Sequence, residues 1–76
     1  MSKKCLSPEI FLGKAVRSRR LELGWSQEDL GFEAGLHRTY VGVIERGEKS
    51  ISVGSLVHLA ETLGVKASDL LHEAGL

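Results

Sequence analysis

Hydrophobic residues recur at helical spacing in several stretches of this chain, and residues that favour helix ends separate these stretches. The first stretch follows Ser7 and Pro8, a helix cap with proline in the first helical position, and it turns Leu12, Val16 and Leu23 inward. Short polar or glycine-containing segments leave no room for strands between the stretches. The pattern therefore predicts an all-α fold of five helices. They are expected over about residues 7–23, 27–34, 37–46, 53–63 and 67–73.

The second and third predicted helices are joined by a tight turn. Ser26 can cap the second helix, and Gly35 can end it in the left-handed conformation that other side chains disfavour. The third helix turns Val41 and Ile44 inward. Two helices joined by a short turn that contains glycine form a helix-turn-helix, whose second helix reads the DNA major groove. We therefore predict such a unit over about residues 27–46.

The sequence resembles the phage-repressor-like (Cro-type) helix-turn-helix family over about residues 12–71. The run V-R-S-R-R-L-E-L-G-W-S-Q from Val16 to Gln27 and the ending I-E-R-G from Ile44 to Gly47 carry this resemblance. Within the family, the segment H-R-T-Y-V-G-V-I-E-R-G is most similar to the controller proteins of restriction-modification systems. The resemblance implies a lambda-repressor-like DNA-binding fold and a regulator that acts on its own promoter. A phage- or plasmid-type repressor, or an antitoxin that represses its own operon, is the alternative.

Side chains at the start of the predicted third helix are candidates for reading bases. Arg38 can donate two hydrogen bonds to O6 and N7 of one guanine, and Thr39 can contact thymine through its hydroxyl and methyl groups. Val43 either contacts a thymine methyl group or faces solvent. Solvent exposure without a DNA contact is the alternative for each of them.

Other residues are candidates for binding the DNA backbone. Gln27 resembles the phosphate-positioning glutamine of the family, where the side-chain amide and the helix N-terminus both donate to a phosphate. Tyr40 is either a core residue or, as the resemblance implies, a phosphate contact. Further candidates, for which solvation is the alternative, are Arg17, Arg46, Lys49 and Ser50.

Arg20 and Glu45 are expected to have a structural role. The resemblance implies an ion pair between them that ties the first helix to the third. Three positions depart from the family pattern: Arg19 replaces an apolar residue, and His37 and Lys66 replace hydroxyl or Asp caps.

A small domain without a disulfide commonly gains stability by pairing with a copy of itself. The predicted helices over about 53–73 carry more apolar residues than one small core needs, and the expected dimer interface consists of Val57, Val65, Leu70 and Leu71. A two-fold dimer would place two reading helices about 34 Å apart, so it predicts a palindromic operator in double-stranded DNA.

Charge and composition limit the other classes of function. The net charge is zero, but residues 1–50 hold nine Lys or Arg and seven acidic residues, whereas residues 51–76 hold one and three. The lone Cys5 cannot form an internal disulfide, and neither a signal peptide nor a membrane span is evident. His58 and His72 lack cysteine partners, so we expect no metal. We expect a single cytoplasmic domain over residues 1–76 with no cofactor, catalytic site or small-molecule effector; a pure protein-binding module is a further alternative.

Overall fold

The computed structural model describes residues 7–76, and within this range it contains helices and no strand. The predicted all-α fold is confirmed. The expectations for Cys5 and for the rest of residues 1–6 lie outside the described residues. The five helices of the described part are α2 (Pro8–Glu22), α3 (Gln27–Ala34), α4 (Arg38–Arg46), α5 (Val53–Leu63) and α6 (Ala67–Glu73).

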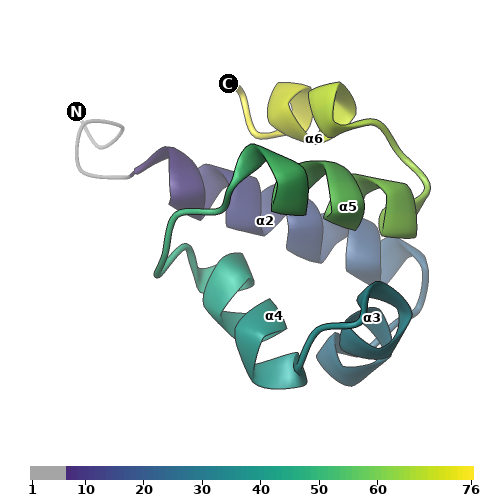
Figure 1. The fold of residues 1–76 in the computed structure, drawn as a ribbon. Helices are drawn as coiled ribbons and strands as arrows, with labels where there is room; N and C mark the ends of the chain where they lie inside the picture. The colour runs from purple at the N-terminus through teal and green to yellow at the C-terminus, as the bar shows by residue number, and fades with distance from the viewer. Residues whose placement is uncertain (1–6) are drawn as a thin grey trace.

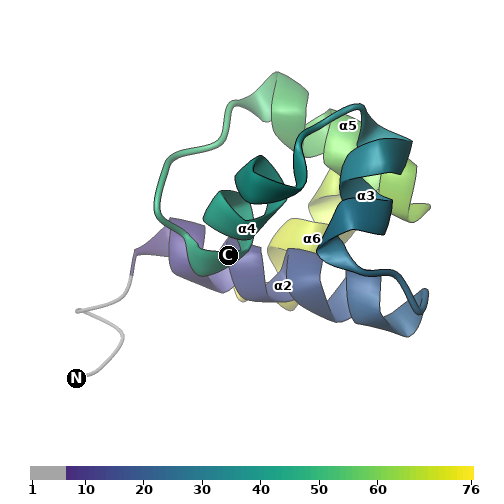
Figure 2. The same cartoon turned by 90° about the horizontal axis from the view of Figure 1, so that it is seen from below.

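The helices are arranged so that α3 and α4 lie on one side of the molecule and α6 lies on the other (Figure 1). Helix α4 packs against α2 and α3, whereas α6 packs against α2 and α5. The view from below shows α3 and α4 next to each other on the near face, with α2 running along one edge (Figure 2). The helix pair predicted to meet DNA therefore shares one face of the fold.

The helix ends follow from local hydrogen bonds that the sequence encodes. The Ser26 hydroxyl accepts from the Asp29 amide at 2.9 Å, and the Asp29 carboxylate accepts from the Ser26 amide at 2.8 Å. The Ser52 hydroxyl accepts from the Ser55 amide at 3.0 Å in the same way. Lys66 offers no side-chain acceptor to α6, but its own amide donates to the Asp69 carboxylate at 3.0 Å. Replacement of the usual cap at Lys66 therefore leaves one of the two capping bonds in place.

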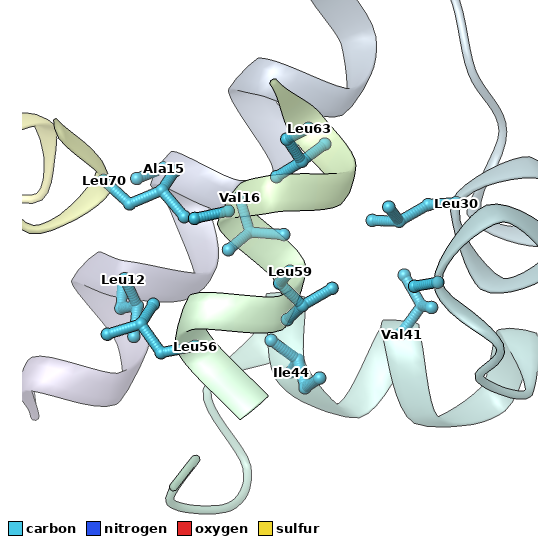
Figure 3. Close-up of a cluster of buried hydrophobic side chains, with 12 residues drawn as sticks. Leu12, Ala15, Val16, Leu30, Val41, Ile44, Leu56, Leu59, Leu63 and Leu70 are labelled. Atoms are coloured by element: carbon cyan, nitrogen blue, oxygen red, sulfur yellow. The ribbon is translucent and has the colours of Figure 1, made fainter. Parts of the chain in front are cut away.

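The core collects apolar side chains from all five helices (Figure 3). Leu30 from α3 and Val41 from α4 point toward Leu59 of α5 in this view, and all three side chains are almost fully buried. These contacts hold the helix-turn-helix pair against the rest of the chain. The complete set of buried apolar residues is Leu12, Ala15, Val16, Leu30, Ala34, Val41, Ile44, Leu56, Leu59, Ala60, Leu63 and Leu70.

Two expectations about apolar residues are corrected by the fold. Leu23 is 46% exposed, because α2 ends at Glu22 and Arg20 takes the inward position one turn after Val16. Leu70 was expected in a dimer interface, but its exposure is 0% because it anchors α6 in the core of the single chain. It has no surface left to offer a partner.

A close approach of two helices at Gly13 was not foreseen from the sequence. A Cβ atom added at Gly13 of α2 would come within 2.5 Å of the carbonyl oxygen of Ile44 in α4. The neighbouring atoms belong to the backbone, so they cannot move aside as a flexible side chain can. Gly13 therefore sets the distance between α2 and the end of α4.

We predict that Gly13→Ala lowers the free energy of unfolding by about 1–3 kcal/mol, because the added methyl group forces α2 and α4 apart. Urea unfolding followed by circular dichroism, at one protein concentration, measures this effect. Gly54→Ala is the matched control, because its Cβ atom would lie no closer than 4.0 Å to the Ser52 hydroxyl. The control should be neutral or stabilising, as alanine favours helices over glycine. Equal stability of the two variants would contradict the prediction.

Candidate DNA-binding surface

The turn between α3 and α4 is closed by backbone and side-chain hydrogen bonds. Gly35 adopts the left-handed conformation with φ of 72°, and the Leu36 amide donates to the Gly31 carbonyl at 2.7 Å. A Cβ atom at Gly31 would come within 2.5 Å of the Leu36 carbonyl oxygen, so the returning chain packs directly on this glycine. The angle between the two helices is thus fixed by a short and closely packed connection.

Two histidines form hydrogen bonds at the two ends of this turn. His37 caps α4, since its Nδ1 atom accepts from the Thr39 amide at 3.0 Å. His58 of α5 donates from Nε2 to the carbonyl of Ala34 at 2.7 Å, and Ala34 is the last residue of α3. The sequence does not predict this bond, because Ala34 and His58 are distant along the chain. A polar residue on the α5 face toward α3 is the only sequence signal for this bond.

The first turn of α4 is exposed, as a reading helix requires. The Arg38 side chain is 63% exposed and lies 3.6 Å from the Glu28 carboxylate of α3, and Thr39 is exposed beside it. Val43 is partly buried, and Tyr40 is partly buried with its ring packed against the core. The opposite side of α4 buries Val41 and Ile44. The three predicted base readers therefore differ in exposure, with Arg38 and Thr39 the most accessible.

A buried ion pair connects α2 to α4. Arg20 donates from Nε to Glu45 Oε2 at 2.7 Å and from Nη2 to Glu45 Oε1 at 3.0 Å, and the two side chains are 7% and 2% exposed. Arg20 Nη1 also donates to the Trp25 carbonyl at 2.7 Å. The hydrogen bonds with Glu45 raise the pKa of the Arg20 guanidinium above its ordinary value. The C-terminal end of α4 is consequently held to α2 by an ion pair with two hydrogen bonds and a defined geometry.

The predicted phosphate residues Gln27 and Arg46 meet at Gly42 in the middle of α4. Gln27 Nε2 donates to Glu45 Oε1 at 3.1 Å, which joins α3 to the same buried pair. Arg46 donates from Nε to Glu48 Oε2 at 2.7 Å and lies over Gly42. This bond raises the pKa of Arg46 and lowers the pKa of Glu48. Gly42 is therefore covered by side chains and is not open to solvent.

The remaining predicted phosphate residues have different surroundings. Arg17 on α2 and Lys49 in the loop after α4 are exposed. The Ser50 hydroxyl donates to the Glu9 carboxylate at 3.0 Å, so its proton is already used. The pKa of Glu9 is lowered by its own backbone amide and, to a smaller extent, by Ser50. Ser50 thus faces an acidic residue in the free protein.

Residues 7–76 contain neither a membrane-spanning helix nor a group of side chains suited to a metal ion. No helix over residues 7–76 is long and apolar enough to cross a bilayer. Within the same range, no three His, Cys, Asp or Glu side chains are grouped so that they could hold a metal ion.

Comparison with known proteins identifies the family of this chain. The model of the helix-turn-helix family matches residues 16–70. Control protein C.BamHI from Bacillus amyloliquefaciens is 43% identical over 63 residues, which cover 82% of this chain and 78% of that protein. The chain belongs to the helix-turn-helix family of control proteins. The resemblance seen in the sequence is thereby confirmed, and with it the function of a DNA-binding regulator.

Solved structures of similar proteins share the fold. The clp gene regulator ClgR from Corynebacterium glutamicum matches with a TM-score of 0.87 and 30% identity, over 92% of this chain and 74% of that chain. The restriction-modification controller protein C.Esp1396I, solved as a tetramer in complex with its natural 35-base-pair operator, matches with a TM-score of 0.78 and 28% identity, over 93% of this chain and 99% of that chain.

We predict that Arg20→Met lowers the free energy of unfolding by about 3–5 kcal/mol, since it leaves the buried Glu45 carboxylate without its cation. The double variant Arg20→Met/Glu45→Leu should recover most of the loss, because an apolar pair needs no compensating charge. Urea unfolding of the two variants measures both effects.

The control for this experiment is Arg46→Met, which breaks the exposed pair with Glu48. It should leave the stability unchanged within error, because exposed ion pairs contribute little. A loss for Arg20→Met as small as that for Arg46→Met would show that the buried pair does not hold the two helices together.

Proposed function

We propose that this control protein is a homodimeric, sequence-specific transcription regulator that binds a palindromic operator with α4. The observation that carries the proposal is the exposed first turn of α4, where Arg38 and Thr39 stand next to a capped helix end. A helix presented in this way fits the major groove with its N-terminal residues at the base edges. The operator complex of C.Esp1396I supports DNA as the partner.

In this proposal the side chains that contact DNA divide into two groups. Arg38 reads one guanine through its guanidinium group, and Thr39 contacts a neighbouring base. The partly buried Val43 contacts a thymine methyl group on the floor of the major groove. Residues around this helix bind phosphates and set its position on the duplex. We assign the phosphate contacts to Gln27, Tyr40, Arg46, Lys49 and Arg17, and we give Ser50 a smaller part because Glu9 occupies its hydroxyl proton.

Dimerisation is the second part of the proposal. Val53 is 77% exposed and Leu76 is 55% exposed, and both line a shallow apolar hollow with Ile51 and Leu71. Such exposed apolar side chains on a small domain favour a contact with another copy. We therefore propose an interface that keeps Val57, Val65 and Leu71 from the predicted set, omits the buried Leu70, and adds Val53 and Leu76.

The output of such a protein is occupancy of its operator. Binding requires no cofactor, small-molecule effector or bond-breaking step, so we propose that the protein is not an enzyme. Because its proposed partner is DNA, we place it in the cytoplasm. We propose that it acts on its own promoter as a controller of a restriction-modification system. Control of a different gene set, which the name of ClgR states for that regulator, is the second candidate. Neighbouring methyltransferase and endonuclease genes would distinguish the first from the second.

We predict that selection from random duplex DNA yields a palindromic site for the wild-type protein. Arg38→Ala should lose the preference at one guanine in each half-site, because one bidentate contact contributes roughly 1–3 kcal/mol of discrimination. Sequencing of the selected pools measures the preference at each position.

The comparison variant is Gln27→Ala, which should weaken binding by a similar factor on every sequence, because a phosphate contact carries no sequence information. An unchanged motif for Arg38→Ala would reject Arg38 as a base reader. If the wild-type protein selects no motif while it still forms dimers, it is a protein-binding module and the proposed function is wrong.

A further inference from the structure

One hydrogen bond connects the two functional sides of the molecule. Helices α5 and α6 carry most of the proposed dimer interface, and α3 and α4 form the proposed DNA-binding surface. His58 of α5 donates from Nε2 to the carbonyl of Ala34 in α3 at 2.7 Å. Among residues 7–76, no other hydrogen bond runs from α5 or α6 to α3 or α4. This bond is therefore the direct polar link between the interface side and the reading side.

The other contacts between α5 and the helix-turn-helix pair are apolar. Helix α5 packs against α3, and Leu59 lies in the same buried cluster as Leu30 and Val41 (Figures 2 and 3). Burial of such side chains draws helices together without a preferred direction. A hydrogen bond, in contrast, restricts both a distance and an angle. The orientation of α3 relative to α5 is therefore specified at His58.

The two partners suit this role. Ala34 is the last residue of α3, and carbonyl groups in the last turn of a helix have no acceptor function within that helix. A carbonyl oxygen only accepts, so the His58 ring carries a proton on Nε2. His58 is exposed, so its ring lies at the edge of the contact between α3 and α5 and not in the core. Its replacement therefore leaves the core packing in place.

Helix α4 is held at both of its ends as a result. The Arg20–Glu45 ion pair ties its C-terminal end to α2. The His58 bond fixes Ala34, which directly precedes the turn into the N-terminal end of α4. A helix held at one end can swing about that end, whereas a helix held at both ends keeps its direction. In a two-fold dimer, this direction sets the distance and the angle between the two reading helices.

We propose that His58 is a positioning residue that fixes the two reading helices relative to each other across the dimer, and thereby selects the spacing of the operator half-sites. This inference rests on the proposed function. One added base pair moves two half-sites about 3.4 Å apart and rotates them by about 34–36°. A dimer with firmly oriented helices then loses contacts in one half-site, whereas a dimer with loosely held helices adjusts to the change.

The experiment measures dissociation constants by fluorescence anisotropy on the selected operator and on two duplexes with one base pair inserted or removed between the half-sites. The spacing penalty is the ratio of the dissociation constants for an altered and the selected duplex. For His58→Leu this penalty should fall roughly two- to tenfold below that of the wild-type protein, the factor that one hydrogen bond contributes. His58→Gln should restore most of the penalty, because its amide places an N–H group near the position of Nε2.

Two further variants serve as controls. His58→Asn has an amide one methylene shorter than His58→Gln, so its N–H group falls short of the Ala34 carbonyl and the variant should resemble His58→Leu. His72→Gln replaces an exposed histidine on α6 and should keep the wild-type penalty. Thermal unfolding and analytical ultracentrifugation select the variants that are folded and dimeric at the temperature of the binding experiment.

The outcomes separate this inference from the proposed function. An unchanged spacing penalty for both His58→Leu and His58→Asn overturns the positioning role and leaves the regulator intact. Equal weakening on all three duplexes shows a role in stability alone and also overturns it, as does a wild-type protein that binds the three duplexes equally. An absence of specific binding by the wild-type protein overturns both.

Discussion

The buried ion pair between Arg20 and Glu45 is the interaction on which the use of this fold depends. It joins the first described helix, α2, to the end of α4 through two short hydrogen bonds in a site almost without solvent. An ion pair of this kind adds little net stability, because removing two charges from water costs about as much as their attraction returns. Its value is geometric, since a fork-shaped guanidinium and a carboxylate meet in one orientation only. The same carboxylate also accepts from Gln27, so one anion relates three helices to each other.

This geometric role matters because the two helices of the proposed DNA-binding surface are short. Helix α3 has 8 residues and α4 has 9, and helices of this length are unstable in water on their own. Their conformation therefore depends on caps at their ends and on packing behind them. His37, His58 and the capping box at Ser26 supply the end contacts, while Gly13 allows the backbones of α2 and α4 to touch. The exposed residues of α4 are consequently carried by a rigid support.

The features of this structure that the sequence predicts are those that depend on residues close together along the chain. Helix bounds and caps depend on neighbours within one turn, so the roles of Ser26 and Gly35 could be predicted from the local sequence. Gly13 and His58 act across the fold, and no local pattern distinguishes a glycine under a crossing helix from one that merely weakens a helix. The prediction of Leu70 in a dimer interface was wrong, because periodicity gives the apolar face of a helix and not what covers that face. The approach of Gln27 and Arg46 to Gly42 likewise depends on how α3 and α4 pack together, which no local pattern shows.

We propose that the face formed by α3 and α4 meets DNA while α6 points away from it. Amide chemical shifts recorded by nuclear magnetic resonance during titration of the protein with its selected duplex test this most directly. We expect the largest changes on the amides of Gln27, Thr39 and Gly42, with small changes along α6 (Ala67–Glu73). Large changes confined to α6, with the amides of α4 unmoved, would contradict it.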